Sequence, residues 1–407
     1  MCVYLTALNP TDAVTHGLLP AAARLGEPIV ILTDDTDAHL RAYADHPHQP
    51  RAVEPANVRD PGAVAARVLT LARRHGAPAA LLSNSDHLQP ATALAAGLLG
   101  LPGKDWRAAT RCKNKFLTRH ALAAEGLDTV ASVEIGLADD PRAIAADVPF
   151  PAVVKPREGV ASEDVLLVGT PDELAARVDE IRARRGACAL VVEEYLAGPL
   201  HTYDTVGDAD RLHHFGSWRT ILAAPPFFTE AGRDWTPRVP EPVRHHLRAQ
   251  LSALGVGLGA CHTEFVVDGQ RARIIEVNYR LIGDTMDLIC AELLGVDLFA
   301  EVIRVHMGQS LSVDLPEPST VDKAAHVRYV RADRAGTLVA APPPVSADLA
   351  GGIRLGHRPL RPVGVAAPLH GTNRDYLSVV HAIGPASAPV TAAVDDFVSA
   401  NRWSVTA

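Results

Sequence analysis

The sequence predicts an α/β protein of several domains. Strand-like and helix-like stretches alternate through the first part of the chain, which is typical of a parallel sheet covered by helices. Hydrophobic residues make up 47% of the 407-residue chain and charged residues 21%, so a large core can form. At this length we expect about two to four domains.

The first 110 residues carry the clearest alternation. Strand-like segments cover residues 3–8, 28–35 and 79–86, and helix-like segments cover residues 16–26 and 61–76. The stretch after the first strand, TALNPTDAVTHG, lacks the GxGxxG pattern that lets a backbone approach a pyrophosphate. We therefore predict a Rossmann-like scaffold and infer no dinucleotide site.

Helices and strands continue through the middle of the chain. Gly126 ends one helical pattern, and Pro156 ends a strongly apolar strand. The elements expected here are, in order, a helix at 112–129, a strand at 150–156, a helix at 171–186, a strand at 189–198 that ends at Gly198, a helix at 241–257, strands at 261–268 and 271–281, and a helix at 284–309.

The segment Asp314–Thr320, DLPEPST, has the composition of a linker. The residues after it hold short strand signals, a proline cluster at 341–346 and a helical pattern at 388–401. We predict a Rossmann-like domain at 1–110, a core domain at 111–313 with a central lid at about 129–197, and a small α+β region at 314–407.

Charge and cysteine usage narrow the class of protein. The formal net charge of −8 argues against a nucleic-acid or anionic-membrane surface. The five cysteines are scattered without CxxC spacing, which favours reduced thiols over a disulfide or zinc framework. No stretch approaches the roughly 20 apolar residues of a membrane span. We expect a cytoplasmic protein without nucleic-acid or membrane partners.

The stretch RIIEVNYRL combines apolar and polar residues in strict alternation. Side chains along a strand point to opposite faces in turn. The chemical face then carries Glu276, Asn278 and Arg280, and the core face carries Ile275, Val277, Tyr279 and Leu281.

The strand before it carries Glu264, and the two strands should form an antiparallel hairpin through Asp268-Gly269. A two-residue turn there would place Glu264 opposite Arg273, whereas a three-residue loop with a bulge would place it opposite Glu276. Facing carboxylates repel unless a cation lies between them. Carboxylate and amide oxygens suit Mg²⁺, so we predict a metal site at Glu264, Glu276 and Asn278. The alternative is a solvent-exposed edge strand.

If such a metal bridges phosphates, the site needs further cations. Lys155 ends the apolar strand PAVVK, where it can reach a phosphate, although strand-end lysines are often simply solvated. In the loop that follows, three small residues allow backbone N–H groups to approach phosphate oxygens: Gly159, Ala161 and Ser162.

Lys115 on the earlier helix is a second phosphate candidate, with Lys113 as its competitor. An adenine ring would find backbone groups and apolar side chains in the extended segment Glu194, Tyr195 and Leu196. Glu193 can hold the amino group or a ribose hydroxyl.

These pieces occur in an order that resembles the ATP-grasp superfamily, especially its carboxylate–amine ligases. The resemblance covers roughly residues 1–310 and is most specific at HTEFVVDGQRARIIEVNYRLIGD. NKFLTRHALAAEGL is similar to the family's Asp-Lys-x-x-x-Arg helix, which favours Lys115 over Lys113. The resemblance implies ATP with Mg²⁺ or Mn²⁺, phosphate contacts from Lys115 and Lys155, and Arg280 beside the transferred phosphoryl group.

The sequence departs from the family pattern at three places. Leu200 stands where an acidic residue usually contacts the ribose, so that contact must come from Glu193, His201 or Asp204. Asn114 stands where the helix motif has Asp, and the phosphate loop is poor in glycine.

The resemblance implies that a substrate carboxylate attacks the γ-phosphate of ATP and that an amine then displaces phosphate from the acyl phosphate. The expected partners are a small carboxylate or amino acid and an amine, in a natural-product or siderophore pathway or in primary metabolism, with a homodimer left open. Trp218 and Arg219 are candidates to grip the substrate, against the alternative of ordinary strand packing. A carboxylase or kinase-like enzyme, or a nucleotide-binding protein without turnover, are the competing functions.

Overall fold

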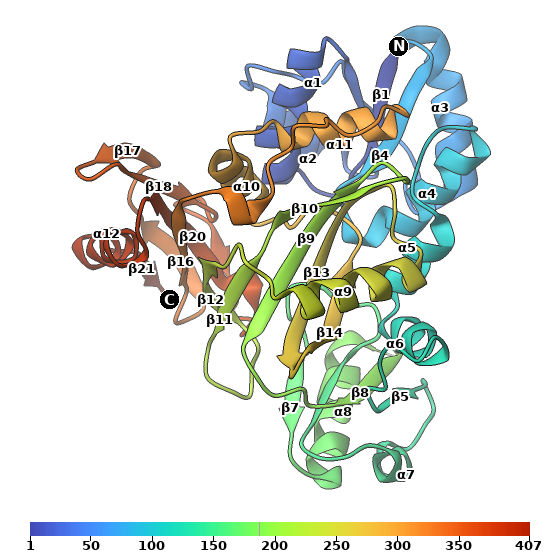
Figure 1. Ribbon diagram of the computed structural model, residues 1–407, viewed down its shortest axis with the longest axis vertical. Helices are drawn as coiled ribbons and strands as arrows, with labels where there is room; N and C mark the ends of the chain where they lie inside the picture. Colours follow the sequence, from blue (N-terminus) through green and yellow to red (C-terminus); the bar gives the residue numbers. More distant parts are fainter. Residues whose placement is uncertain (187) are drawn as a thin grey trace.

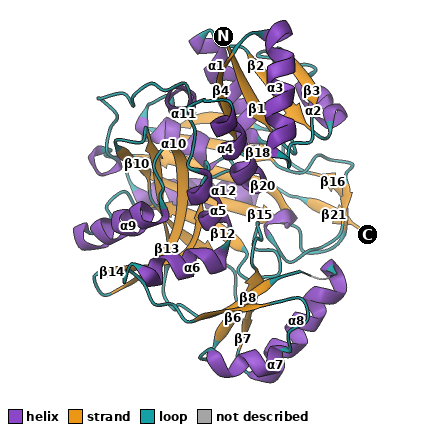
Figure 2. Cartoon of the chain, turned by 90° about the vertical axis from the view of Figure 1, so that its right-hand side faces the viewer, coloured by secondary structure: helices purple, strands orange, loops and turns teal. Residues whose placement is uncertain are grey.

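A computed structural model describes residues 1–186 and 188–407. Within this part of the chain the strands form four sheets. In Figure 1 the N-terminal sheet lies at the top and the largest sheet in the middle. The sheet formed by strands within residues 132–194, called the lid sheet below, lies at the bottom, and the C-terminal strands extend to the left. Figure 2 shows the same vertical arrangement from the side.

The N-terminal sheet is parallel, as its alternating pattern predicts. Its order is β3 (Ala52–Pro55), β2 (Ile29–Thr33), β1 (Cys2–Thr6) and β4 (Pro78–Ser83). Helices cover both faces, so the central strands β1 and β2 are buried and almost wholly apolar. Val3 and Leu5 join one core and Tyr4 joins the other, as strand alternation requires. The helices of this region are α1 (Leu19–Leu25), which follows a π-helical turn at Ala13–Leu18, α2 (Thr36–Tyr43), α3 (Pro61–His75) and α4 (Gln89–Leu98).

The largest sheet has ten strands and combines the middle and the end of the chain. Its order is β14 (Arg271–Asn278), β13 (Gly259–Asp268), β9 (Leu200–Gly207), β11 (Trp218–Leu222), β12 (Glu230–Trp235), β15 (Ala324–Arg331), β20 (Tyr376–Gly384), β18 (Ile353–Pro359) and β17 (Val345–Leu349), with β10 (Leu212–Gly216) paired to β9. The strands after residue 314 therefore continue the sheet that carries Glu264 and Glu276. Helix α12 (Ser387–Ala400) packs on β15 and β20, and β16 (Gly336–Ala340), β19 (Ala366–Ala367) and β21 (Ser404–Thr406) form a small separate sheet.

The lid sheet has the order β5 (Ser132–Ile135), β8 (Leu190–Glu194), β6 (Ala152–Pro156) and β7 (Leu166–Val168). Helices α7 (Pro141–Ile144) and α8 (Pro171–Arg185) close its core from one side. Strand β8 ends at Glu194, four residues before the predicted Gly198, because the segment Tyr195–Gly198 leaves the sheet. The predicted domain boundaries themselves stay a prediction.

Two predicted helices are broken by capping residues. The helix expected at 112–129 begins only at Lys115, as α6 (Lys115–Ala124). The residue before it, Asn114, is extended and ends the preceding helix α5 (Trp106–Lys113). Asn114 also caps α6, because its Oδ1 accepts the Leu117 N–H. Gly295 has a φ of 67° and ends α10 (Met286–Leu294), so the helix expected at 284–309 restarts as α11 (Leu298–His306). The other long helix is α9 (Glu241–Leu254).

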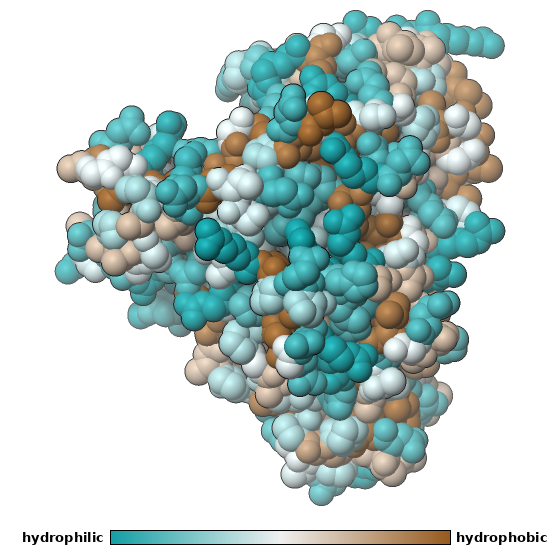
Figure 3. Space-filling view, in the orientation of Figure 1, coloured by the Kyte–Doolittle hydropathy of each residue, from teal (hydrophilic) through white to brown (hydrophobic). Residues whose placement is uncertain are grey.

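No helix in the described part of the chain combines the length and the apolar character that crossing a bilayer requires. Polar and apolar residues are interspersed over the face drawn in Figure 3.

Candidate active site

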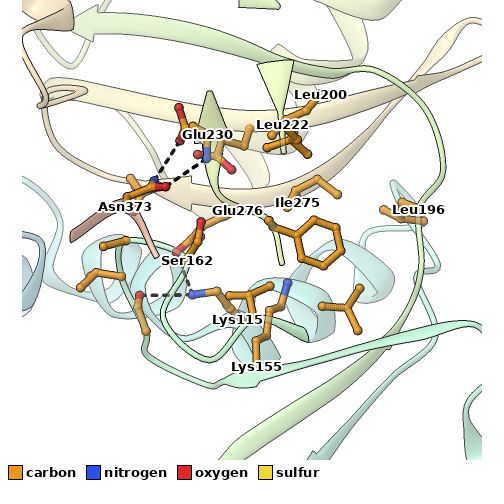
Figure 4. Close-up of a pocket in the computed structure, with 18 of the residues that line it drawn as sticks. Lys115, Lys155, Ser162, Leu196, Leu200, Leu222, Glu230, Ile275, Glu276 and Asn373 are labelled. Carbon is orange, nitrogen blue, oxygen red and sulfur yellow. Dashed lines mark hydrogen bonds and ion pairs between the residues drawn. The ribbon is translucent and has the colours of Figure 1, made fainter. Parts of the chain in front are cut away.

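A pocket lies where the lid sheet faces the ten-stranded sheet. The lid contributes Lys155 at the end of β6, the loop after it and the end of β8, and helix α6 contributes Lys115. The opposite wall includes side chains from β9, β11, β12, β13 and β14 of the ten-stranded sheet. Figure 4 shows apolar side chains at one end, among them Leu196, Leu200 and Leu222, and charged or polar side chains at the other. The pocket therefore has an apolar compartment and a charged compartment.

Glu264 lies directly opposite Glu276 in the β13–β14 hairpin. This confirms the predicted facing of the two acids, but the register arises differently. A two-residue connection, Gly269–Gln270, joins Asp268 to its partner Arg271, and a bulge in β14 then shifts the register by one residue. The prediction that Ile275 faces the core is wrong, because the bulge turns it to the pocket beside Glu276.

Each of the two facing carboxylates has a cationic partner within the protein. Lys115 Nζ lies 2.7 Å from Glu276 Oε1, and His262 Nε2 lies 3.4 Å from Glu264 Oε1. Burial alone would lower the pKa of Lys115, but Glu276 outweighs burial and raises it. The sequence-based prediction assumed that a bound cation compensates the charges of the two acids. In the structure Lys115 and His262 also compensate them.

Behind Glu264 lies a buried chain of polar groups. Asp204 Oδ1 is 2.5 Å from His262 Nδ1, and the Thr202 hydroxyl donates to Asp204 Oδ2 at 2.9 Å. Burial alone would lower the pKa of His262, but Asp204 outweighs it and raises the pKa to about 9. Burial alone would raise the pKa of Glu264, whereas His262 and then Arg233 lower it to about 2. Glu264 thus stays an anion that can accept a cation from the pocket.

The donors of Glu264, Glu276 and Asn278 fit a hard divalent cation. All three side chains line the pocket, and Asn278 is buried at the end of β14. Two carboxylates and one amide provide oxygen ligands and leave room for water or phosphate, which Mg²⁺ normally retains. The ligand set is thus compatible with Mg²⁺ bound together with a phosphate.

Lys155 is held by a buried network of charges. Its Nζ lies 2.7 Å from Glu193 Oε2, and Arg119 donates to both oxygens of Glu193 at 2.9 Å. Burial lowers the pKa of Lys155 and, against the attraction of Glu193, Arg119 and Lys115 lower it further. Burial alone would raise the pKa of Glu193, but Arg119 and Lys155 outweigh it and keep the pKa well below the usual range.

Glu193 lines the pocket, and its predicted role in adenine or ribose recognition stays a prediction. Its carboxylate is committed to two buried cations, and an ionised group this buried needs such partners. Arg119 is the arginine of the NKFLTR helix, for which the sequence alone offered no function.

The apolar compartment lies between the two sheets and includes the predicted segment after β8. Leu196 and Tyr195 line it, and the Glu194 carboxylate turns to Arg273 at 2.8 Å. The remaining apolar lining comes from Val153, Val165, Leu200, Leu222, Phe228, Val266 and Ile275. Gly159, Ala161 and Ser162 of the loop also line the pocket, and Lys115 Nζ donates to Gly159 O at 3.4 Å.

Four predicted residues lie outside the pocket lining. Trp218 is fully buried and packs edge-on against Trp235, with ring centroids 5.0 Å apart. Arg219 lies on the exposed face of β11 and pairs with Asp234 at 2.5 Å. The prediction that both grip a substrate is wrong, because their β11 positions direct one into the core and the other to solvent.

The same holds for the two remaining ribose candidates. His201 packs at a tilt against Phe265 with ring centroids 5.7 Å apart, and Asp204 is fully buried with His262 and Thr202 as partners. Neither lines the pocket.

The charged compartment contains four residues that the sequence analysis missed: Glu230, Arg233, Asp284 and Asn373. Arg233 is buried and donates from Nε to Glu230 Oε2 at 2.8 Å, and its buried Nη1 has no hydrogen-bond partner within the described part of the chain. Burial raises the pKa of Glu230 against the opposing effect of Arg233. No local pattern identifies Glu230, Arg233 or Asn373, because they come from distant segments without a recognisable motif. Asp284 ends the stretch in which the family resemblance is most specific, but that resemblance gave it no role.

Arg280 lines the pocket as predicted, but its guanidinium turns back to the main chain. Its Nη1 donates to Leu281 O at 2.6 Å and Ile282 O at 2.5 Å, and its Nε lies 3.6 Å from Asp86 Oδ1. These contacts fix its position at the edge of the charged compartment.

No family model matches the chain. Among curated proteins, it is 29% identical to the uncharacterized protein y4rH of Sinorhizobium fredii over 75% of this chain and 64% of that one. It is 30% identical to a D-alanine–D-alanine ligase of Desulforudis audaxviator over 44% and 63% of the two chains. It is also 30% identical to the ATP-grasp enzyme fsqD of Aspergillus fumigatus, over 47% and 32%. The chain thus spans less than two thirds of each of these relatives.

Solved structures match over nearly the whole chain. The L-amino acid ligase of Bacillus licheniformis superposes with a TM-score of 0.79 at 18% identity, covering 100% of this chain and 99% of that one. A biotin carboxylase of Campylobacter jejuni superposes with a TM-score of 0.69 at 14% identity, covering 99% and 92%. These similarities confirm the predicted ATP-grasp fold, and the sequence matches include a ligase and an enzyme described as ATP-grasp.

Proposed function

We propose that this protein is an ATP- and Mg²⁺-dependent ligase that joins the carboxylate of one small molecule to the amine of another. One observation carries the proposal. The facing acids Glu264 and Glu276, with Asn278, lie in a pocket that also holds two buried lysines and ends in an apolar compartment. This combination suits a nucleoside triphosphate that binds together with a metal ion.

ATP would lie along the length of the pocket. Apolar side chains of the two sheets would enclose the adenine, with main-chain groups of the Glu194–Leu196 segment at its edge. Lys155 and Lys115 would meet the phosphates as buried point charges. Lys115 would exchange part of its contact with Glu276 for a phosphate oxygen once a divalent cation occupies the acids.

Glu264, Glu276 and Asn278 would hold Mg²⁺, which would supply neutralisation of phosphate charge when bound. The remaining work falls to the protein. Lys155 and Arg280 would stabilise negative charge on the transferred group, and the closed lid would exclude water.

The bond changes balance without a protein nucleophile. A carboxylate oxygen of the first substrate attacks the γ-phosphorus, the bond to the ADP oxygen breaks, and an acyl phosphate forms. The amine nitrogen of the second substrate then attacks the acyl carbon, inorganic phosphate leaves, and the nitrogen loses a proton. Positioning and charge stabilisation suffice for such phosphoryl transfer.

An amino acid is the substrate class that fits the charged compartment best. The unpartnered Nη1 of Arg233 suits a carboxylate, and Glu230 and Asp284 nearby suit an ammonium group. The L-amino acid ligase similarity favours amide formation over the carboxylation suggested by the biotin carboxylase similarity.

The test is ADP release from purified protein with Mg·ATP and pools of amino acids, other carboxylates and amines, offered separately and together. The proposal predicts ADP release that needs both a carboxylate and an amine, and a condensed product by mass spectrometry. ADP release with bicarbonate alone, or a stable phosphorylated product, would overturn it in favour of a carboxylase or kinase.

A further inference from the structure

The turn 370–375 brings the C-terminal part of the chain into the pocket. It connects β19 to β20 and contributes Asn373 to the pocket lining. Figure 4 shows Asn373 next to Glu230 in the charged compartment, on the same side as Ser162 of the loop after β6. This turn is thus the meeting point of three segments that are distant in the sequence.

The turn 370–375 is fixed by its own hydrogen bonds. Asp375 is buried, and its carboxylate accepts the main-chain N–H groups of His370 at 2.9 Å, Gly371 at 2.6 Å and Thr372 at 3.2 Å. The Thr372 side chain caps the short helical turn in return. Charge-assisted bonds of this kind hold Asn373 in place independently of any ligand.

The Asn373 side chain grips Glu230 at two points. The Glu230 main-chain N–H donates to Oδ1 at 3.1 Å, which orients the amide and leaves Nδ2 facing Glu230 Oε1 at 3.4 Å. Arg233 holds the other oxygen, Oε2, at 2.7 Å from Nη2. The Glu230 carboxylate is thus clamped between an amide and a guanidinium, with its orientation set by Asn373 on one side.

The same turn contacts the loop after β6. The Asn373 main-chain N–H donates to Ala161 O at 3.3 Å, and Arg374 forms an ion pair with Glu163, which also pairs with Arg185 at 2.8 Å. The loop needs such support because three of its residues have left-handed backbone angles without being glycine: Ala161 at 57°, Ser162 at 55° and Asp164 at 57°. Conformations of this kind persist where surrounding contacts impose them.

We propose that the turn 370–375 is a latch that holds the 159–164 loop closed over the pocket and sets the Glu230 carboxylate for a cationic group of the substrate. Asn373 is a positioning residue in both respects, through its main chain toward the loop and through its side chain toward Glu230. Closing the loop and orienting Glu230 are therefore one event. The inference rests on the proposed function only for the identity of the ligands.

The latch is tested by hydrogen–deuterium exchange on the ligand-free, full-length protein. Arg374→Ala removes the ion pair with Glu163 and should speed exchange in residues 157–166 by about fivefold, equivalent to about 1 kcal/mol. Arg374→Lys keeps the charge and should restore most of the protection. Arg334→Ala removes a comparably exposed arginine from an ion pair with Asp333 elsewhere in the C-terminal region and should change nothing in the loop. Unchanged loop exchange in Arg374→Ala would overturn the latch.

The role of the Asn373 side chain is tested separately, by amide exchange at Glu230 and by KM values. Asn373→Ala should expose the Glu230 amide to faster exchange, whereas Asn373→Asp keeps an acceptor oxygen and should preserve protection there. In turnover, Asn373→Ala should raise the KM for the substrate with the ammonium group about tenfold, or about 1.4 kcal/mol, with little change in the KM for ATP. Equal effects on both KM values, or none, would overturn the positioning role.

These outcomes separate the two proposals. If wild type forms no amide but the exchange changes appear, the latch stands and the proposed function fails. If amides form and neither exchange nor the KM values respond, the proposed function stands and the latch fails.

Discussion

Lys115 Nζ lies 2.7 Å from Glu276 Oε1 and joins helix α6 to the strand that carries the candidate metal ligands. Both groups are largely removed from solvent, with exposed side-chain fractions of 6% for Lys115 and 22% for Glu276. The ion pair gives Glu276 a structural role beside its proposed role as a metal ligand, so its substitution should have two separable consequences.

Glu276→Gln should reduce turnover by about a hundredfold or more, because it removes an anionic ligand of the proposed metal ion that neutralises the reacting phosphates. It should also lower the unfolding temperature, since Lys115 loses its counter-charge in a buried position. The double variant Lys115→Met/Glu276→Gln should recover stability without recovering ADP release. Wild-type turnover in Glu276→Gln would contradict the metal assignment, and a double variant less stable than either single one would contradict the ion-pair account.

Glu193→Gln should destabilise the protein by about 3–5 kcal/mol, because Arg119 and Lys155 would remain buried without a full counter-charge. The neighbouring Glu194→Gln is a matched control. Glu194 pairs with Arg273 at a more exposed position, so its loss should cost about 1 kcal/mol or less. Urea denaturation of the two variants measures the difference. Similar losses for both would show that the Arg119–Glu193–Lys155 network contributes no more than a surface pair.

Local periodicity was enough to predict much of the site from the sequence. Alternation along RIIEVNYRL identified the faces of Glu276 and Asn278, and the hairpin signal brought Glu264 opposite them. The pairing of Glu193 with Arg119 and Lys155 was not predicted, because partners so distant in sequence leave no trace in a strand's own pattern.

The errors at Trp218 and Arg219 have a related origin. A strand pattern gives two faces without saying which one borders the pocket, and here neither residue does. Arg233 and Asn373 reach the pocket from β12 and from a turn after β19, and only the order of strands in the ten-stranded sheet brings them together.

Arg233→Met should lower kcat/KM for the amino acid substrate by about a hundredfold, because it removes a buried guanidinium aimed at the substrate end. Arg219→Met is the matched control from the neighbouring strand. Its guanidinium is exposed and pairs with Asp234, so ADP release should stay within about twofold of wild type. Steady-state kinetics with varied amino acid at saturating ATP gives both values. A larger loss of kcat/KM in Arg219→Met than in Arg233→Met would place the substrate site at β11 instead.

Two buried histidines should make the fold sensitive to acid. Burial lowers the pKa of His214 to about 3 and that of His306 to about 4, whereas an unfolded histidine titrates near 6.5. The unfolded chain therefore binds more protons below about pH 6.5, so this stability is complete above that pH and is lost as the pH falls toward 4. Each histidine contributes a slope of about 1.4 kcal/mol per pH unit. His306→Gln keeps a donor for Val302 O, which His306 Nδ1 contacts at 2.7 Å, and should remove its share of the slope. Between pH 7.5 and pH 4.5 the free energy of unfolding of the variant, measured by urea denaturation, should rise relative to that of wild type by about 2.5 kcal/mol. A constant difference across that range would rule out a neutral, buried His306.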